Sequence, residues 1–78
     1  MKQITILTFG SIADITGKNN FVLSDVDSTE ILKKQLEEQY PQLKTIHYAI
    51  AVDKQIVTDN TSLQHNSTVA ILPPFSGG

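Results

Sequence analysis

The 78-residue sequence contains no cysteine and no arginine. Without cysteine the chain can form neither a disulfide nor a thiolate zinc site, and it has no cysteine nucleophile. Arginine is the preferred side chain for contacts with phosphates and base edges, so its absence argues against a nucleic-acid partner. The two histidines, His47 and His65, lie far apart, and we expect both to face solvent and no metal to be bound.

Long hydrophobic runs are also missing. No stretch approaches the ~20 apolar residues that span a bilayer. Residues 1–10 contain one lysine and an apolar run that polar residues interrupt, which is typical of a β-strand and not of a signal peptide. We therefore expect a cytoplasmic protein with no membrane partner.

The short length limits stability. A single domain of 78 residues buries only about 60–65 % of the surface of its unfolded chain. Domains of this size often gain stability from disulfides, metals or partners. Since the composition argues against the first two, a partner protein is a plausible source of additional stability.

Five segments are predicted to be β-strands. Apolar residues alternate with polar ones in several of them, and residues 46–52 are densely apolar. Leu63 is the one apolar anchor in the turn-rich stretch before the last strand, and Asp53 with Lys54 is expected to form a tight turn. The five predicted strands are residues 2–9, 19–26, 46–52, 55–57 and 68–73.

Residues 27–41 are the clearest helix candidate. Asp27 or Ser28 can cap its first turn, and Pro41 should end it. A shorter helical turn is expected after the first strand, capped by Ser11 and ended by Gly17. The apolar stripe of the long helix is predicted to comprise Ile31, Leu32, Leu36 and Tyr40.

The order strand, strand, helix, strand, short strand, strand predicts an α+β fold. A single main helix packs on one face of a mixed sheet, which is the ubiquitin-like β-grasp architecture. We assign residues 1–72 to this domain and residues 73–78 to an extended C-terminal tail.

One helix can cover only one face of a sheet. If the helix covers Ile4, Ile6, Val69 and Ile71, the opposite face carries an apolar cluster, which favours a protein–protein interface. The alternative is that residues 10–17 cover this cluster. The predicted interface residues are Leu7, Phe9, Ile56 and Leu72.

The sequence finishes with ILPPFSGG. Pro73 and Pro74 restrict the backbone to an extended path, and Phe75 offers an apolar contact to a partner. Gly77 and Gly78 have no side chains, so they can enter a narrow channel. The residues predicted to insert into a partner are Pro73, Pro74, Phe75, Ser76 and Gly77.

A terminal carboxylate reacts only after activation, and the chain has no means of activating it. There is no phosphate-binding G-x-x-x-x-G-K-[ST] loop and no Ser/His/Asp arrangement. The four glycines do not form a phosphate cradle. The sequence therefore predicts a carrier whose reactive group is the carboxyl end of Gly78 and whose catalysts are other proteins.

Four stretches resemble the small subunit of molybdopterin synthase, a family of ubiquitin-like sulfur carriers. They are ITILTFGSIADITG, STEILKKQL, YAIAVDKQIV and NSTVAILPPFSGG, which together span nearly the whole chain. The P-P-x-x-G-G ending is the most diagnostic piece. Asp53 departs from the family, which often has asparagine at this turn.

The resemblance implies a reaction sequence. A ubiquitin-activating-type enzyme adenylates Gly78 with ATP, and a sulfur donor protein converts the adenylate to a thiocarboxylate. The tail then inserts into the large synthase subunit and donates sulfur to cyclic pyranopterin monophosphate, within a heterotetramer. The chain would act as a sulfurtransferase subunit with no catalytic group beyond Gly78 and no cofactor of its own. Family interface positions match Phe9, Ile56 and Leu72.

Three alternatives remain open. The chain could be the sulfur carrier of thiamine-thiazole synthesis, although that family is usually shorter and lacks the two prolines. It could be a ubiquitin-like modifier that forms isopeptide bonds with lysines. It could also be an interaction module whose tail is inert.

Overall fold

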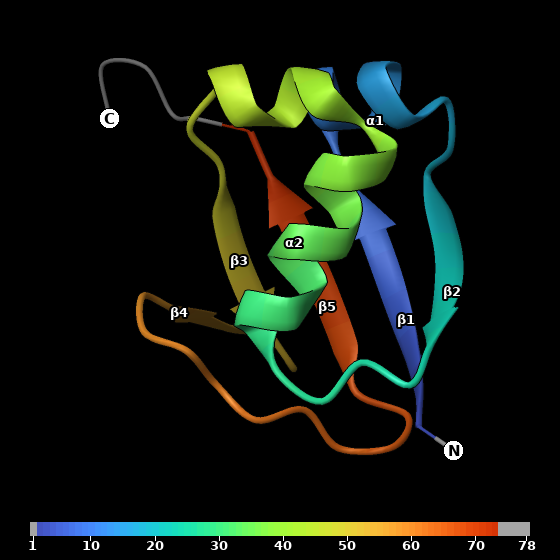
Figure 1. Cartoon of the computed structure of the whole chain (residues 1–78), viewed down its shortest axis with the longest axis vertical. Coiled ribbons are helices and arrows are strands. Elements are labelled where there is room, and N and C mark those ends of the chain that lie inside the picture. The colour runs from blue at the N-terminus through green and yellow to red at the C-terminus, as the bar shows by residue number, and fades with distance from the viewer. Residues whose placement is uncertain (1, 74–78) are drawn as a thin grey trace.

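A five-stranded mixed sheet forms the centre of the computed structural model, which describes residues 2–73. The strand order is β2-β1-β5-β3-β4, and only the β1–β5 pair is parallel among the described strands (Figure 1). All five predicted strands are present. Their bounds are β1 (Gln3–Thr8), β2 (Asn20–Ser24), β3 (Ala49–Val52), β4 (Gln55–Val57) and β5 (Thr68–Leu72).

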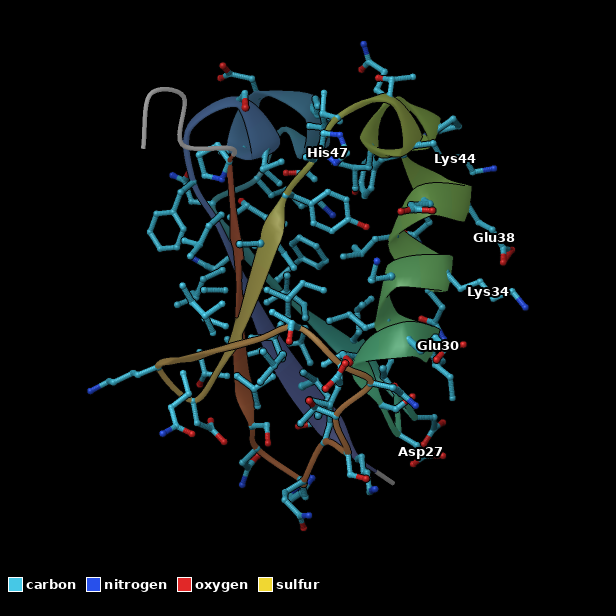
Figure 2. The ribbon with its side chains drawn as sticks, turned by 90° about the vertical axis from the view of Figure 1, so that its left-hand side faces the viewer. Asp27, Glu30, Lys34, Glu38, Lys44 and His47 are labelled. Atoms are coloured by element: carbon cyan, nitrogen blue, oxygen red, sulfur yellow. The ribbon has the colours of Figure 1, made fainter. Side chains whose placement is uncertain are left out.

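The main helix, α2 (Thr29–Gln39), crosses one face of this sheet. Figure 2 shows the layers edge-on, with the labelled side chains of Glu30, Lys34 and Glu38 on the side of α2 that points away from the sheet. A short helix, α1 (Gly10–Thr16), and a 3-10 helix, η1 (Pro41–Thr45), lie at one end of the sheet. The predicted α+β architecture with one main helix is confirmed.

The core lies between α2 and the sheet. Ile4 and Ile6 from β1 and Val69 and Ile71 from β5 are fully buried there, as predicted. The parallel register places Ile6 beside Val69, so the two central strands present their apolar side chains to the helix together. Burial of each such side chain contributes about 1.5–3 kcal/mol.

The ends of α2 follow the predicted signals, but its apolar stripe is narrower. The Ser28 hydroxyl accepts a hydrogen bond from the backbone N–H of Ile31, and Pro41 starts η1 just after α2 ends. Ile31 itself was wrongly placed in the stripe, since 42 % of its surface is exposed. Leu32 and Leu36 are buried because they, and not Ile31, project towards the sheet.

The predicted cap of α1 was also wrong. Ser11 lies inside α1, and the residue at the capping position is Phe9, whose side chain makes no capping hydrogen bond. Gly17 ends the helix in the left-handed region, with φ of 73°, as predicted. Two side chains of α1, Ile12 and Thr16, are buried.

The turn between β3 and β4 and the anchor before β5 match the sequence prediction. Asp53 and Lys54 both have positive φ values, 48° and 74°, which suits a two-residue hairpin. Leu63 is fully buried. The third strand is shorter than predicted, because residues 46–48 precede the paired segment Ala49–Val52.

Candidate functional site

The face of the sheet opposite α2 carries a row of apolar side chains. The register places Leu7 of β1 opposite Ala70 of β5, Ala70 opposite Ala51 of β3, and Ala51 opposite Ile56 of β4. Residues directly opposite each other in neighbouring strands point to the same face. Four strands therefore contribute to one apolar surface.

A hollow of about 450 Å³ lies on this face, mostly surrounded by apolar groups. Its floor includes Ala51 and Ala70, whose methyl groups are too short to fill the space between the larger side chains of neighbouring positions. Asp53 and Lys54 bring charge to one margin. The residues around the hollow are Leu7, Phe9, Ala51, Asp53, Lys54, Thr68, Ala70 and Leu72.

Three of the four predicted interface residues meet at this hollow. Leu7 and Leu72 are half-buried, and Phe9 exposes 46 % of its surface. Ile56 shares the same row of the sheet but lies outside the hollow, on the edge strand, with 62 % of its surface exposed. The structure thus brings Leu7, Phe9 and Leu72 together and places Ile56 at the margin of the same face. Their role as an interface remains a prediction.

The alternative in which residues 10–17 cover the cluster is wrong. The side chain of Ile12 in α1 is fully buried and belongs to the core on the α2 side of the sheet. Phe9, immediately before α1, stays exposed. Within residues 2–73 no helical residue lines the hollow, and α2 lies on the other side of the sheet (Figure 2).

The tail begins beside the hollow. Leu72 lines the hollow and ends β5, and Pro73 follows it. Because β1 and β5 run parallel with Thr8 opposite Ile71, both strands finish at the same end of the sheet. The predicted reactive and insertion residues beyond this point lie outside the described residues: Pro74, Phe75, Ser76, Gly77 and Gly78.

Gly10 is a neighbour of Pro73 that was not predicted from the sequence. It has a φ of 54°, and a Cβ added to it would lie 3.1 Å from Cγ of Pro73. From the sequence, Gly10 was considered only as part of a possible phosphate cradle. The signal that could have indicated this contact is a glycine placed directly after an apolar strand, which often marks a close approach of another segment.

A polar cluster lies on the other side of the sheet, against α2. The hydroxyl of Tyr48 donates a hydrogen bond to Oε2 of Glu37 at 2.7 Å, and Nζ of Lys33 lies 5.9 Å from the centroid of the Tyr48 ring. Burial, followed by the hydrogen bond to Glu37, raises the pKa of Tyr48 well above its usual value. Tyr48 therefore acts as a hydrogen-bond donor at neutral pH and is unsuited to act as a base.

The two histidines have different surroundings. His47 is exposed ahead of β3, as expected. His65 is exposed as well, but its Nδ1 accepts a hydrogen bond from the backbone N–H of Gln3, so it also helps to hold the start of β1. Among residues 2–73, no cluster of three or more histidine, aspartate or glutamate side chains could hold a metal ion. No helix in this part of the chain is both long and apolar enough to cross a bilayer.

Two relatives with similar sequences match over all or nearly all of their length. A protein described as the molybdopterin synthase sulfur carrier subunit of Caenorhabditis elegans is 31 % identical, with 100 % of both chains covered. The protein of the same description from Chlamydomonas reinhardtii is 34 % identical, with 97 % of this chain and 99 % of the relative covered.

Solved structures share the fold at lower identity. A Pyrococcus furiosus chain assigned as molybdopterin converting factor subunit 1 matches with a TM-score of 0.87 at 14 % identity, over 96 % of this chain and all of the other. Small archaeal modifier protein 1 of Methanosarcina acetivorans matches with a TM-score of 0.83 at 20 % identity, over 100 % and 98 % of the two chains. These likenesses identify the ubiquitin-like β-grasp fold.

A third solved structure contains two kinds of subunit. It is described as a complex of subunits 1 and 2 of the molybdopterin-converting factor from Helicobacter pylori, and it matches with a TM-score of 0.73 at 24 % identity, over 97 % and 99 % of the two chains. The model of the ThiS family matches residues 6–78. This match extends over nearly the whole sequence and agrees with the relatives above, and the chain therefore belongs to the ThiS family.

Proposed function

We propose that this chain is the sulfur carrier subunit of a molybdopterin synthase. The structural observation that carries the proposal is the continuity between the apolar hollow and the tail, since Leu72 lines the hollow and Pro73 begins the tail. A partner that binds over the hollow would therefore meet the base of the tail at the margin of the interface. Full-length relatives described as sulfur carrier subunits support this assignment.

The proposed chemistry takes place at Gly78. A separate activating enzyme joins the terminal carboxylate to AMP from ATP and releases pyrophosphate. A sulfur donor protein then displaces AMP and leaves a thiocarboxylate. Its sulfur is transferred to cyclic pyranopterin monophosphate during molybdenum cofactor synthesis.

In this scheme the chain contributes the sulfur and the docking surface, and the partners contribute catalysis. Tyr48 stays protonated at neutral pH and lies on the helix side of the sheet, whereas the hollow lies on the opposite face. The sulfurtransferase activity therefore belongs to the assembly, with Gly78 as the only reacting group of this subunit. The subunit needs no cofactor, and ATP is consumed by the activating enzyme in the cytoplasm.

The proposed docking partner is the large synthase subunit. The Helicobacter pylori complex pairs a chain of this fold with a second subunit. The hollow around Leu7, Phe9 and Leu72 offers an apolar patch with charges at its margin, which suits a protein partner. Two carriers and two large subunits would form a heterotetramer.

The test is the intact mass of the chain after incubation with activating enzyme, ATP and a sulfur source. Replacement of one oxygen by sulfur at Gly78 is expected. A variant that lacks Gly78 and a variant with one alanine added after it serve as controls, and both should stay unmodified. An unmodified native chain, or full modification of both controls, would contradict the proposal.

Further products of the reaction distinguish the proposed function from two alternatives, a protein modifier and a thiamine-thiazole carrier. A ubiquitin-like modifier would appear as species of high mass joined through Gly78 to lysines. A thiamine-thiazole carrier would gain sulfur but would not restore molybdopterin formation with a large synthase subunit. Formation of molybdopterin from cyclic pyranopterin monophosphate by the charged chain and that subunit would exclude both alternatives and an inert tail.

A further inference from the structure

We propose that Gly10 is a positioning residue for the tail. In this view, the missing side chain at Gly10 lets Pro73 pack against the start of α1, and this contact sets the direction in which the chain leaves β5. The inference rests on the proposed function, because the direction matters only if Gly78 must reach a reaction centre in a partner.

The parallel pairing of β1 and β5 explains why these residues meet. Thr8 lies opposite Ile71, and two residues further along their chains come Gly10 and Pro73. The chain at Gly10 turns into α1 with a φ of 54°, and the position of a Cβ at Gly10 would lie next to the proline ring. This contact between Gly10 and Pro73, called the seat of the tail below, therefore joins two residues 63 positions apart in the sequence.

The contact leaves little room for a side chain at Gly10. A Cβ at Gly10 would lie 3.1 Å from Cγ and 3.7 Å from Cβ of Pro73, so the proline would have to give by a few tenths of an ångström. A change of ring pucker can move Cγ of Pro73 alone, but the ring is also bonded to its own backbone nitrogen, so a ring that moves as a whole carries the backbone with it. We infer that part of the displacement passes to the backbone at the base of the tail, and the spectra described below test this.

A small change at this base has a larger effect at the reactive end. The five residues from Pro74 to Gly78 would span roughly 15 Å along a polyproline-like path on insertion. Over that length a rotation of about 10° at Pro73 moves the end of the chain by about 3 Å. Misplacement of a reacting group by about 1 Å can already cost 10²-fold in rate.

Gly17 provides a matched control. It shares the positive φ of Gly10, at 73°, but a Cβ there would meet nothing within 4 Å. Both glycines are exposed and lie at opposite ends of α1, Gly10 as its first residue and Gly17 as its C-cap. Gly10→Ala and Gly17→Ala therefore carry a similar cost of about 1–2 kcal/mol for a left-handed residue with a side chain. Only the substitution at Gly10 crowds Pro73.

The first arm of the experiment does not depend on activity. Amide spectra of the uniformly ¹⁵N-labelled full chain are compared for wild type, Gly10→Ala and Gly17→Ala. We expect Gly10→Ala to shift the signals of residues 75–78, and we expect Gly17→Ala to leave them in place. Unchanged tail signals in Gly10→Ala, or equal shifts in both variants, would overturn the contact as a seat for the tail.

The second arm measures thiocarboxylate formation by intact mass at limiting and saturating carrier concentrations. We expect Gly10→Ala to lower kcat/KM at least about fivefold, mainly through kcat, because the substitution changes the direction of the tail and leaves the rest of the carrier surface as it is. Gly17→Ala should match wild type. The Gly10→Ala effect should disappear when it is made in a Pro73→Ala background, since alanine lacks the crowded Cγ.

The outcomes distinguish this inference from the proposed function. If wild type gains no sulfur, the proposed function fails, and the first arm alone decides whether Gly10 seats Pro73. If wild type is charged but Gly10→Ala is charged equally fast, the positioning role is refuted while the carrier function stands. A Gly10→Ala defect that persists unchanged with Pro73→Ala would assign it to backbone strain and overturn the inference.

Discussion

Truncation of Phe9 to alanine should weaken binding of the proposed large subunit by about 30-fold. An aromatic side chain has about 200 Å² available for burial, and 46 % of Phe9 is exposed in this structure. A partner could therefore cover about 90 Å² of it. At about 25 cal/mol per Å², this area corresponds to about 2 kcal/mol of binding free energy, or roughly 30-fold in Kd.

The assay is isothermal titration calorimetry with purified large subunit. Ile31→Ala is the matched control, because Ile31 exposes a similar 42 % of its surface but lies on α2, on the other side of the molecule. We expect Ile31→Ala to bind like wild type. Phe9 is also half-buried against its own domain, so circular dichroism must first establish that both variants are folded at the assay temperature.

The result that would refute this reasoning is specific. If Phe9→Ala binds as tightly as wild type, the partner does not cover the hollow. If Ile31→Ala weakens binding instead, the partner docks on the helix side of the sheet. In either case the assignment of the open sheet face as the interface would be wrong.

Three further substitutions test the fold that supports the site. Tyr48→Phe removes the hydrogen bond to Glu37 and should lower the free energy of unfolding by about 1 kcal/mol at pH 7, measured with urea. Because folding raises the Tyr48 pKa above its unfolded value of 10.0, the related stability is complete below that pH and is lost above it. Wild type should therefore lose stability relative to Tyr48→Phe above about pH 10, and a constant difference would contradict this cause. Ser28→Ala removes the cap on the N–H of Ile31 and should cost about 0.5–1 kcal/mol in the same assay, and an unchanged midpoint would show that the cap contributes nothing. Leu63→Ala empties a fully buried site and should cost about 2–5 kcal/mol, seen as a large drop in melting temperature, and a shift of only a degree or two would contradict its burial.

The sequence determined the order of the elements and the faces of the central strands. Alternation of apolar residues is a local property, so Ile6 and Val69 could be assigned to the buried face from the sequence alone. The end of α1 at Gly17 and the tight turn at Asp53 and Lys54 could also be predicted, because both depend on the backbone preferences of neighbouring residues. Ile31 was misassigned because Ile31 and Leu32 are neighbours on the apolar side of the helix, and the sequence does not show which of them faces the sheet. That depends on how α2 is rotated against the sheet, which only the tertiary structure determines.

The composition of the open face could also be derived from the sequence, since Leu7 and Leu72 alternate with residues of the core. The hollow could not, because it depends on Ala51 and Ala70 being brought side by side from strands 19 positions apart. The seat of Pro73 on Gly10 depends in the same way on long-range pairing. Side-chain period and backbone preference are set by neighbours along the chain, whereas a cavity or a close contact forms only where distant segments meet.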